Sequence, residues 1–97
     1  MEKVRSGLDF NKAVSYIVTY GMRLYLSNEG HPAMCRSIGK DNVLCGGRFR
    51  LVDGILKMYS TTGYLPNTEV KHREMVETWI EEELAGVVNF VNFEWVK

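Results

Sequence analysis

The sequence predicts a single α+β domain, in which an antiparallel sheet of about four strands carries two helices on one face. The length of 97 residues is that of one domain. Two amphipathic helical patterns lie towards the two ends of the chain. Between them, an Asp53-Gly54 pair separates two apolar runs, as in a β-hairpin. We expect residues 1–8 to form a flexible lead-in to this domain.

The first helix is predicted over residues 10–18. Apolar side chains recur there at the i, i+3, i+4, i+7, i+8 spacing of one helix face. Asp9 precedes this pattern as an N-cap, and Gly21 follows it as a C-terminal stop. Several residues of the pattern are β-branched, which lowers helix propensity because χ1 freedom is lost. The apolar stripe consists of Phe10, Ala13, Val14, Ile17 and Val18.

A strand and a long connection are predicted next. Residues 22–26 alternate between apolar and polar side chains, which is the period of a half-buried strand. Residues 27–42 contain Gly30, Pro32 and Gly39, which are typical of turns and loops. Because loops of this length are uncommon in compact domains and are often functional, the segment is a candidate for a binding or catalytic loop.

The hairpin over residues 48–59 is the strongest local prediction. Just before it, residues 43–45 are expected to form a short strand that Gly46-Gly47 ends. Asp-Gly favours a two-residue type I′ turn, because both central residues then take positive φ. This turn places Arg48 opposite Tyr59 and Arg50 opposite Lys57. One face is then apolar, with Phe49, Leu51, Leu56 and Met58, and the other is basic and aromatic, with Arg48, Arg50, Lys57 and Tyr59.

The C-terminal part is predicted to be a helix followed by a strand. Asn67 or Thr68 is the expected N-cap, and the helix extends to about Ala85, where Gly86 ends it. Residues 91–95 alternate between apolar and polar side chains and are expected to form the last strand of the sheet. The apolar stripe of the helix consists of Met75, Val76, Trp79, Ile80 and Leu84.

Charge and cysteine content restrict the function. Twelve basic and twelve acidic residues cancel, which argues against a dedicated nucleic-acid-binding protein. No apolar run has the length of a membrane span or forms a signal-peptide core, so we expect a cytoplasmic protein. Cys35 and Cys45 are expected to be free thiols in that compartment, and a disulfide between them is the alternative that their spacing permits. Two cysteines and two distant histidines do not have zinc-site spacing, and we expect no metal and no cofactor.

The basic-aromatic face of the hairpin is the candidate contact site. Like charges at Arg50 and Lys57 repel across the strand pair, and an anionic partner would relieve that repulsion. Arg48 and Tyr59 would add a guanidinium fork and an aromatic ring. In the alternative interpretation, acidic residues elsewhere in the chain neutralise this face. Lys40, next to Gly39, is a further candidate phosphate contact, although the other residues of a P-loop are missing.

Two other groups of residues are weaker candidates for chemistry. Glutamates in the last helix offer paired carboxylates for acid–base work, but a glutamate-rich solvent face is the commoner structure. His31 with Cys35 or Cys45 would make a nucleophile pair if the fold brought them together, whereas His72 has no such neighbour in the sequence. The alternative that the protein is a small enzyme depends on Cys, His or Glu residues of the long connection over residues 27–42. The glutamates are Glu77, Glu81, Glu82 and Glu83.

Three short features point to one family. The first is a Phe-x-x-Ala opening helix that ends in Gly, found here at Phe10, Ala13, Ile17 and Gly21. The second is the Gly39-Lys40 pair, and the third is a terminal Phe-Glu-Trp-Val at residues 93–96. On these residues the chain resembles the small phage proteins that counter the bacterial Thoeris defence by sequestering its cyclic ADP-ribose-type signal. It departs from that family in its longer last helix and in residues 27–30, where the family has a Trp-Asn-Gly-Lys-type segment.

Residues and resemblance together predict a small non-enzymatic binding protein, such as a phage-type inhibitor or counter-defence factor. It would occlude a host protein or sequester a small anionic nucleotide. The abundance of Tyr with Arg and Met is typical of interfaces. A third alternative is a structural subunit that assembles through strand edges. Val52 and Ile55, opposite each other at the hairpin tip, are suited to contact between copies, so a homo-oligomer is compatible with the binding hypotheses.

Overall fold

The computed structural model describes residues 8–60 and 65–96, which form a five-stranded sheet and two helices. The strand order is β2-β1-β3-β4-β5, and every pair is antiparallel except β4–β5. The predicted α+β class is therefore confirmed, with one strand more than expected. The elements are β1 (Val14–Thr19), β2 (Leu24–Ser27), α1 (His31–Ile38), the 3-10 turn η1 (Lys40–Asn42), β3 (Val43–Val52), β4 (Ile55–Tyr59), α2 (Val70–Leu84) and β5 (Asn92–Val96).

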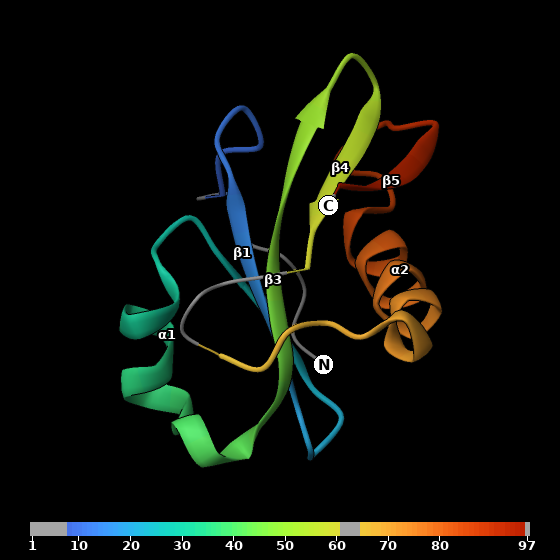
Figure 1. Ribbon diagram of the computed structural model, residues 1–97. Coiled ribbons are helices and arrows are strands. Elements are labelled where there is room, and N and C mark those ends of the chain that lie inside the picture. Colours follow the sequence, from blue (N-terminus) through green and yellow to red (C-terminus); the bar gives the residue numbers. More distant parts are fainter. Residues whose placement is uncertain (1–7, 61–64, 97) are drawn as a thin grey trace.

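The two helices lie on opposite faces of the sheet, not on one face as the sequence predicted (Figure 1). The main core lies between the sheet and α2, where Val76 and Ile80 pack with Val14, Tyr16 and other sheet residues. A smaller core lies on the other face, where Met34 and Cys35 of α1 pack against Ile17. Successive residues of a strand point to opposite faces, so β1 supplies side chains to both cores.

The first predicted helix is wrong, because residues 14–19 form the strand β1. All six residues of β1 are buried. A strand covered on both faces has no strict alternation of apolar and polar residues, and the apolar residues Val14, Ile17 and Val18 of β1 also match the i, i+3, i+4 spacing of a helix. The β-branched residues Val14, Ile17, Val18 and Thr19 favour the strand that is observed. The expected lead-in over residues 1–8 lies, apart from Leu8, outside the described residues.

The predicted long connection is also wrong, since it contains α1 and η1. Gly30 is the N-cap of α1, and Pro32 stands in its first turn, where a missing N–H costs nothing. Gly39 ends the helix at φ 90°, and its N–H donates to the Cys35 carbonyl at 2.9 Å. The same Gly and Pro residues that indicated a loop are thus the two ends of a short helix.

The hairpin is confirmed residue by residue. Arg48 pairs with Tyr59, Arg50 with Lys57 and Val52 with Ile55, as the two-residue turn requires. Asp53 and Gly54 have φ of 50° and 80°, the left-handed values of a type I′ turn. The predicted end of the preceding strand at Gly46-Gly47 is wrong, because β3 continues through both glycines to the hairpin.

The C-terminal helix and strand are confirmed, with α2 ending at Leu84 and Gly86 following at φ 78°. The predicted N-cap is wrong, because α2 begins at Val70 and its N-cap is Glu69, not Asn67 or Thr68. β5 then pairs with β4 in parallel, which needs a crossover connection, and α2 provides it.

Within the described ranges, no helix is long and apolar enough to cross a membrane. β5 and β2 are the two edges of the sheet.

Candidate functional site

A pocket of about 240 Å³ lies on the basic-aromatic face of the hairpin. Its described lining residues are Ala13, Arg48, Arg50 and Tyr59. Arg48 and Arg50 stand two positions apart on β3 and share one face, and Tyr59 of β4 pairs with Arg48. Ala13 directly precedes Val14, which pairs with Phe49, so it reaches the same part of the face from the β1 side. Three of the five predicted contact residues therefore meet in one pocket.

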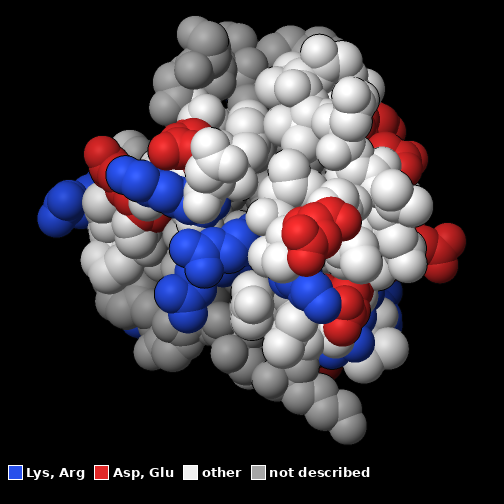
Figure 2. Space-filling view, turned by 90° about the horizontal axis from the view of Figure 1, so that it is seen from above, with Lys and Arg blue, Asp and Glu red and all other residues white. Residues whose placement is uncertain are grey.

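The pocket lies towards the end of the molecule that carries the hairpin tip. The view onto that end shows Lys and Arg side chains across the middle of the face, with Asp and Glu side chains beside them (Figure 2). The side chains of Arg48 and Arg50 are exposed. Among the described residues, neither guanidinium has a carboxylate within ion-pair distance. Both positive charges are therefore directed to solvent or to a ligand.

Lys57 belongs to the same face but has a partner within the chain. It stands opposite Arg50 on β3 and opposite Glu94 on β5, and its ammonium forms an ion pair with the Glu94 carboxylate. Glu94 relieves the repulsion between Arg50 and Lys57 that the hairpin register creates. A partly exposed pair of this kind contributes about 0–1 kcal/mol to folding. The alternative that an acidic residue neutralises part of this face is thus correct for Lys57.

Lys40, the fifth predicted contact residue, is remote from the pocket. It lies in η1, immediately before Val43 at the far end of β3 from the hairpin turn. Arg48 lies five positions after Val43 along the extended strand, which is a distance of about 17 Å. Lys40 therefore does not act on the same ligand group as Arg48 and Arg50.

Gly47 of β3 allows the last residue of β4, Tyr59, to pack closely against β3. A Cβ at Gly47 would collide with the Tyr59 carbonyl oxygen and would lie 2.5 Å from the Tyr16 hydroxyl. Only glycine allows both groups to approach the strand so closely. The Tyr16 hydroxyl lies 2.6 Å from Thr68 Oγ1 in the main core, and burial raises the pKa of Tyr16 above its ordinary value. The strand that carries Arg48 and Arg50 therefore packs closely against Tyr16 and the end of β4.

Of the two Cys–His pairs of the enzyme alternative, the fold separates His31 from Cys45, whereas His31 and Cys35 are both buried on α1, four positions apart. His31 is buried on the α1 face, where Nε2 lies 2.9 Å from the Gly47 carbonyl and 3.2 Å from the Tyr16 carbonyl. Because both neighbours are acceptors, Nε2 carries the proton. Burial lowers the pKa of His31 and raises that of the Cys45 thiol. Cys45 belongs to the core of the opposite face, and Cys35 and Cys45 are both free.

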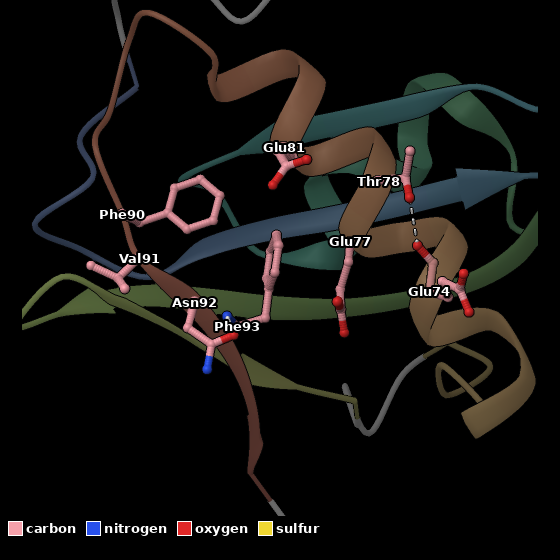
Figure 3. A pocket seen from close by; sticks show the side chains of 8 residues that line it. All are labelled: Glu74, Glu77, Thr78, Glu81, Phe90, Val91, Asn92 and Phe93. Carbon is pink, nitrogen blue, oxygen red and sulfur yellow. Dashed lines mark hydrogen bonds between the residues drawn. The ribbon is translucent and has the colours of Figure 1, made fainter.

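A second pocket, of about 260 Å³, lies between α2 and the segment that enters β5 (Figure 3). Glu74, Glu77 and Glu81 line its helix side, and Phe90 and Phe93 line the other in an edge-to-face pair with centroids 5.0 Å apart. The Trp95 indole N–H donates to Glu77 Oε2 at 2.7 Å. That bond assigns Glu77 a role in docking the helix onto the sheet.

The four glutamates of the predicted acidic run lie in three different surroundings. Glu77 and Glu81 line the second pocket, Glu82 is exposed, and Glu83 is buried. No group of three or more His, Cys, Asp or Glu side chains that would hold a metal ion occurs in the described part of the chain. Among these glutamates, the hydrogen bond from the Trp95 indole gives Glu77 a structural role.

Sequence reasoning missed Ala13 and Glu94 as parts of the site. Ala13 had been assigned to a helix stripe, and only the β1–β3 register reveals its position beside the arginines. Glu94 sits on the solvent face of a correctly predicted strand, but nothing in the sequence indicates that this strand pairs with β4.

Comparisons of the chain with protein-family models, with curated proteins and with solved structures find no match.

Proposed function

We propose that this chain is a small non-enzymatic binding protein that holds an anionic group of its partner between Arg48 and Arg50. The observation that carries the proposal is the pocket on the hairpin, in which two exposed guanidinium groups and the Tyr59 ring line one hollow. Guanidinium groups present planar forks that match carboxylate and phosphate oxygens. A small anionic ligand fits the hollow better than a flat protein surface does, because the arginines line a concavity.

The biological role we propose is that of a phage-type counter-defence factor acting in the host cytoplasm. This part rests on the resemblance given by the Gly39-Lys40 pair and the terminal residues 93–96. The opening helix of the resemblance does not contribute, because its residues from Val14 onwards form β1. The enzyme alternative has less support, because His31 and Cys35 are buried in the α1 core and donate no reactive group to a pocket of the described residues.

The test measures binding of a defined panel of anions by isothermal titration calorimetry. The panel consists of 5′-AMP, phenyl phosphate and polyglutamate, which represent a nucleotide, a simple phosphate ester and an acidic protein surface. The wild type is expected to bind at least one of them. An Arg48→Gln, Arg50→Gln double variant is expected to lose that binding by about a hundredfold, because two charge-assisted contacts are removed.

The control is an Arg23→Gln, Arg36→Gln variant. Both arginines are exposed and lie outside the pocket, so the net charge changes equally while the site stays intact. Equal losses in the two double variants would mean that binding depends on net charge alone. That result, or a wild type that binds no member of the panel, would overturn the proposal.

A further inference from the structure

We infer that the pocket is selective for a group with two negative charges on one phosphorus, a terminal phosphomonoester carried by a small flat molecule. The inference rests on the proposed function and specifies its ligand. It follows from the charge balance of the face, from the spacing of the two arginines and from the size of the pocket.

The charge balance sets the preferred charge of the ligand. Arg48, Arg50 and Lys57 supply three positive charges on this face, and Glu94 supplies one negative charge through its ion pair with Lys57. These four described side chains together present a net charge of +2 to the ligand. Glu94 is half exposed beside this face, so it repels any negative charge that extends past Arg50 towards β5. A ligand with two negative charges therefore balances the positive charge of this face, whereas Glu94 repels the further charges of a longer polyanion.

The spacing of the arginines fits one phosphate group. Arg48 and Arg50 are two residues apart on one strand, so their Cα atoms are separated by about 7 Å. Both long side chains rise from the same face and line the same pocket. Two guanidinium forks at this spacing converge on the oxygens of a single phosphate, and a phosphomonoester offers three such oxygens.

The volume and the lining residues of the pocket indicate the size and shape of the group that carries the phosphate. About 240 Å³ lies below the usual range for drug-sized ligands, so there is room for a phosphate and roughly one ring. Tyr59 pairs with Arg48 and contributes its aromatic side chain to the lining, and the small side chain of Ala13 leaves space on the β1 side. A flat ring stacked on Tyr59, with its phosphate between the arginines, satisfies both observations.

The test compares three probes of one aryl series by calorimetry at constant ionic strength. Phenyl phosphate carries two charges on one phosphorus, methyl phenyl phosphate carries one, and phenyl diphosphate extends the charge outward. The wild type is expected to bind phenyl phosphate about tenfold more tightly than the methyl ester, and the diphosphate no more tightly than the monophosphate. The Arg48→Gln, Arg50→Gln variant is expected to bind none of the three.

A Glu94→Gln variant tests the charge balance directly. It releases Lys57, so its affinity for phenyl diphosphate is expected to rise by about threefold to tenfold relative to phenyl phosphate. A Glu82→Gln variant is the matched control, because Glu82 is an exposed carboxylate that does not line this pocket. The control is expected to keep the wild-type order of affinities.

Two results would overturn the inference while leaving the proposed function in place. The first is equal wild-type affinity for the monoester and its methyl ester, lost in the Arg48→Gln, Arg50→Gln variant. The second is tighter wild-type binding of the diphosphate or of polyglutamate than of phenyl phosphate, with the same dependence on both arginines. Binding that no longer depends on the arginines would instead contradict the proposed function itself.

Discussion

Tyr16 and Thr68 are joined inside the main core by a hydrogen bond of 2.6 Å between their hydroxyl oxygens. Thr68 Oγ1 in turn donates to the Gly46 carbonyl at 3.1 Å, so its own proton is used there and Tyr16 acts as donor to Thr68. The chain of bonds connects β1, the segment before α2 and β3. It fastens the start of α2 to the middle of the sheet.

A Thr68→Val substitution tests the strength of this connection. Valine keeps the shape of threonine but leaves the buried Tyr16 hydroxyl without its acceptor, which costs about 1–3 kcal/mol of unfolding free energy. Urea unfolding followed by circular dichroism measures the change. Thr78→Val is the control, since the exposed Thr78 hydroxyl bonds only to the Glu74 carbonyl of its own helix. Similar losses at both positions would show that the buried bond has no special weight.

Gly47 makes a second prediction about the framework beneath the site. In a Gly47→Ala variant, the new methyl group collides with the Tyr59 carbonyl and the Tyr16 hydroxyl, so β4 or Tyr16 must move. We expect a loss of about 1–3 kcal/mol or more in unfolding free energy. Gly21→Ala is the matched control, because its Cβ would have its nearest neighbour, Thr19 Oγ1, at 3.7 Å. A variant at position 47 as stable as the control would contradict the close packing described here.

The local parts of the fold were predictable because they depend on neighbouring residues. The Asp53-Gly54 turn determines the register of its own hairpin, and with it the common face of Arg48, Arg50 and Tyr59. The apolar stripe of α2 and the glycine that follows it are equally local signals. Most of the candidate site could therefore be read from one hairpin.

The remaining parts depend on contacts between distant segments. β1 is buried on both faces, so its apolar residues do not alternate, and the spacing of Val14, Ile17 and Val18 matches a helix as well as a buried strand. Ala13 is misplaced with them for the same reason. The parallel pairing of β5 with β4 follows from the crossover through α2, and it alone brings Glu94 to Lys57. No spacing within either segment indicates such a pairing.

His31 gives the fold a pH dependence with a defined sign. Burial, and secondly the nearby Arg48 charge, lower the pKa of His31 below 6.5, against the raising effect of its two backbone hydrogen bonds. The unfolded chain then takes up a proton as the pH falls below about 6.5, while the folded chain does not. The stabilising contribution is complete above that pH and is lost as the pH falls towards the lowered folded value.

A His31→Gln variant tests this dependence. Its unfolding free energy is expected to change less between about pH 7.5 and pH 5.5 than that of the wild type, because the titrating group is gone. The glutamine amide can still donate to the Tyr16 or Gly47 carbonyl, so the variant is expected to fold. Parallel pH curves for variant and wild type would exclude His31 as the source.

Ala13 allows the pocket to be closed without changing a charge. An Ala13→Leu substitution adds three carbon atoms to the wall next to Arg48 and Arg50, so a ligand loses room while both guanidinium groups remain. Ala13 is exposed, and we expect unfolding free energy to change by less than about 0.5 kcal/mol. Phenyl phosphate affinity, measured by calorimetry, is expected to fall about tenfold or more. Asn11→Leu places the same side chain at an exposed position outside the described lining and should bind like the wild type. Unchanged affinity in the Ala13 variant would mean that the arginines bind their anion outside the pocket.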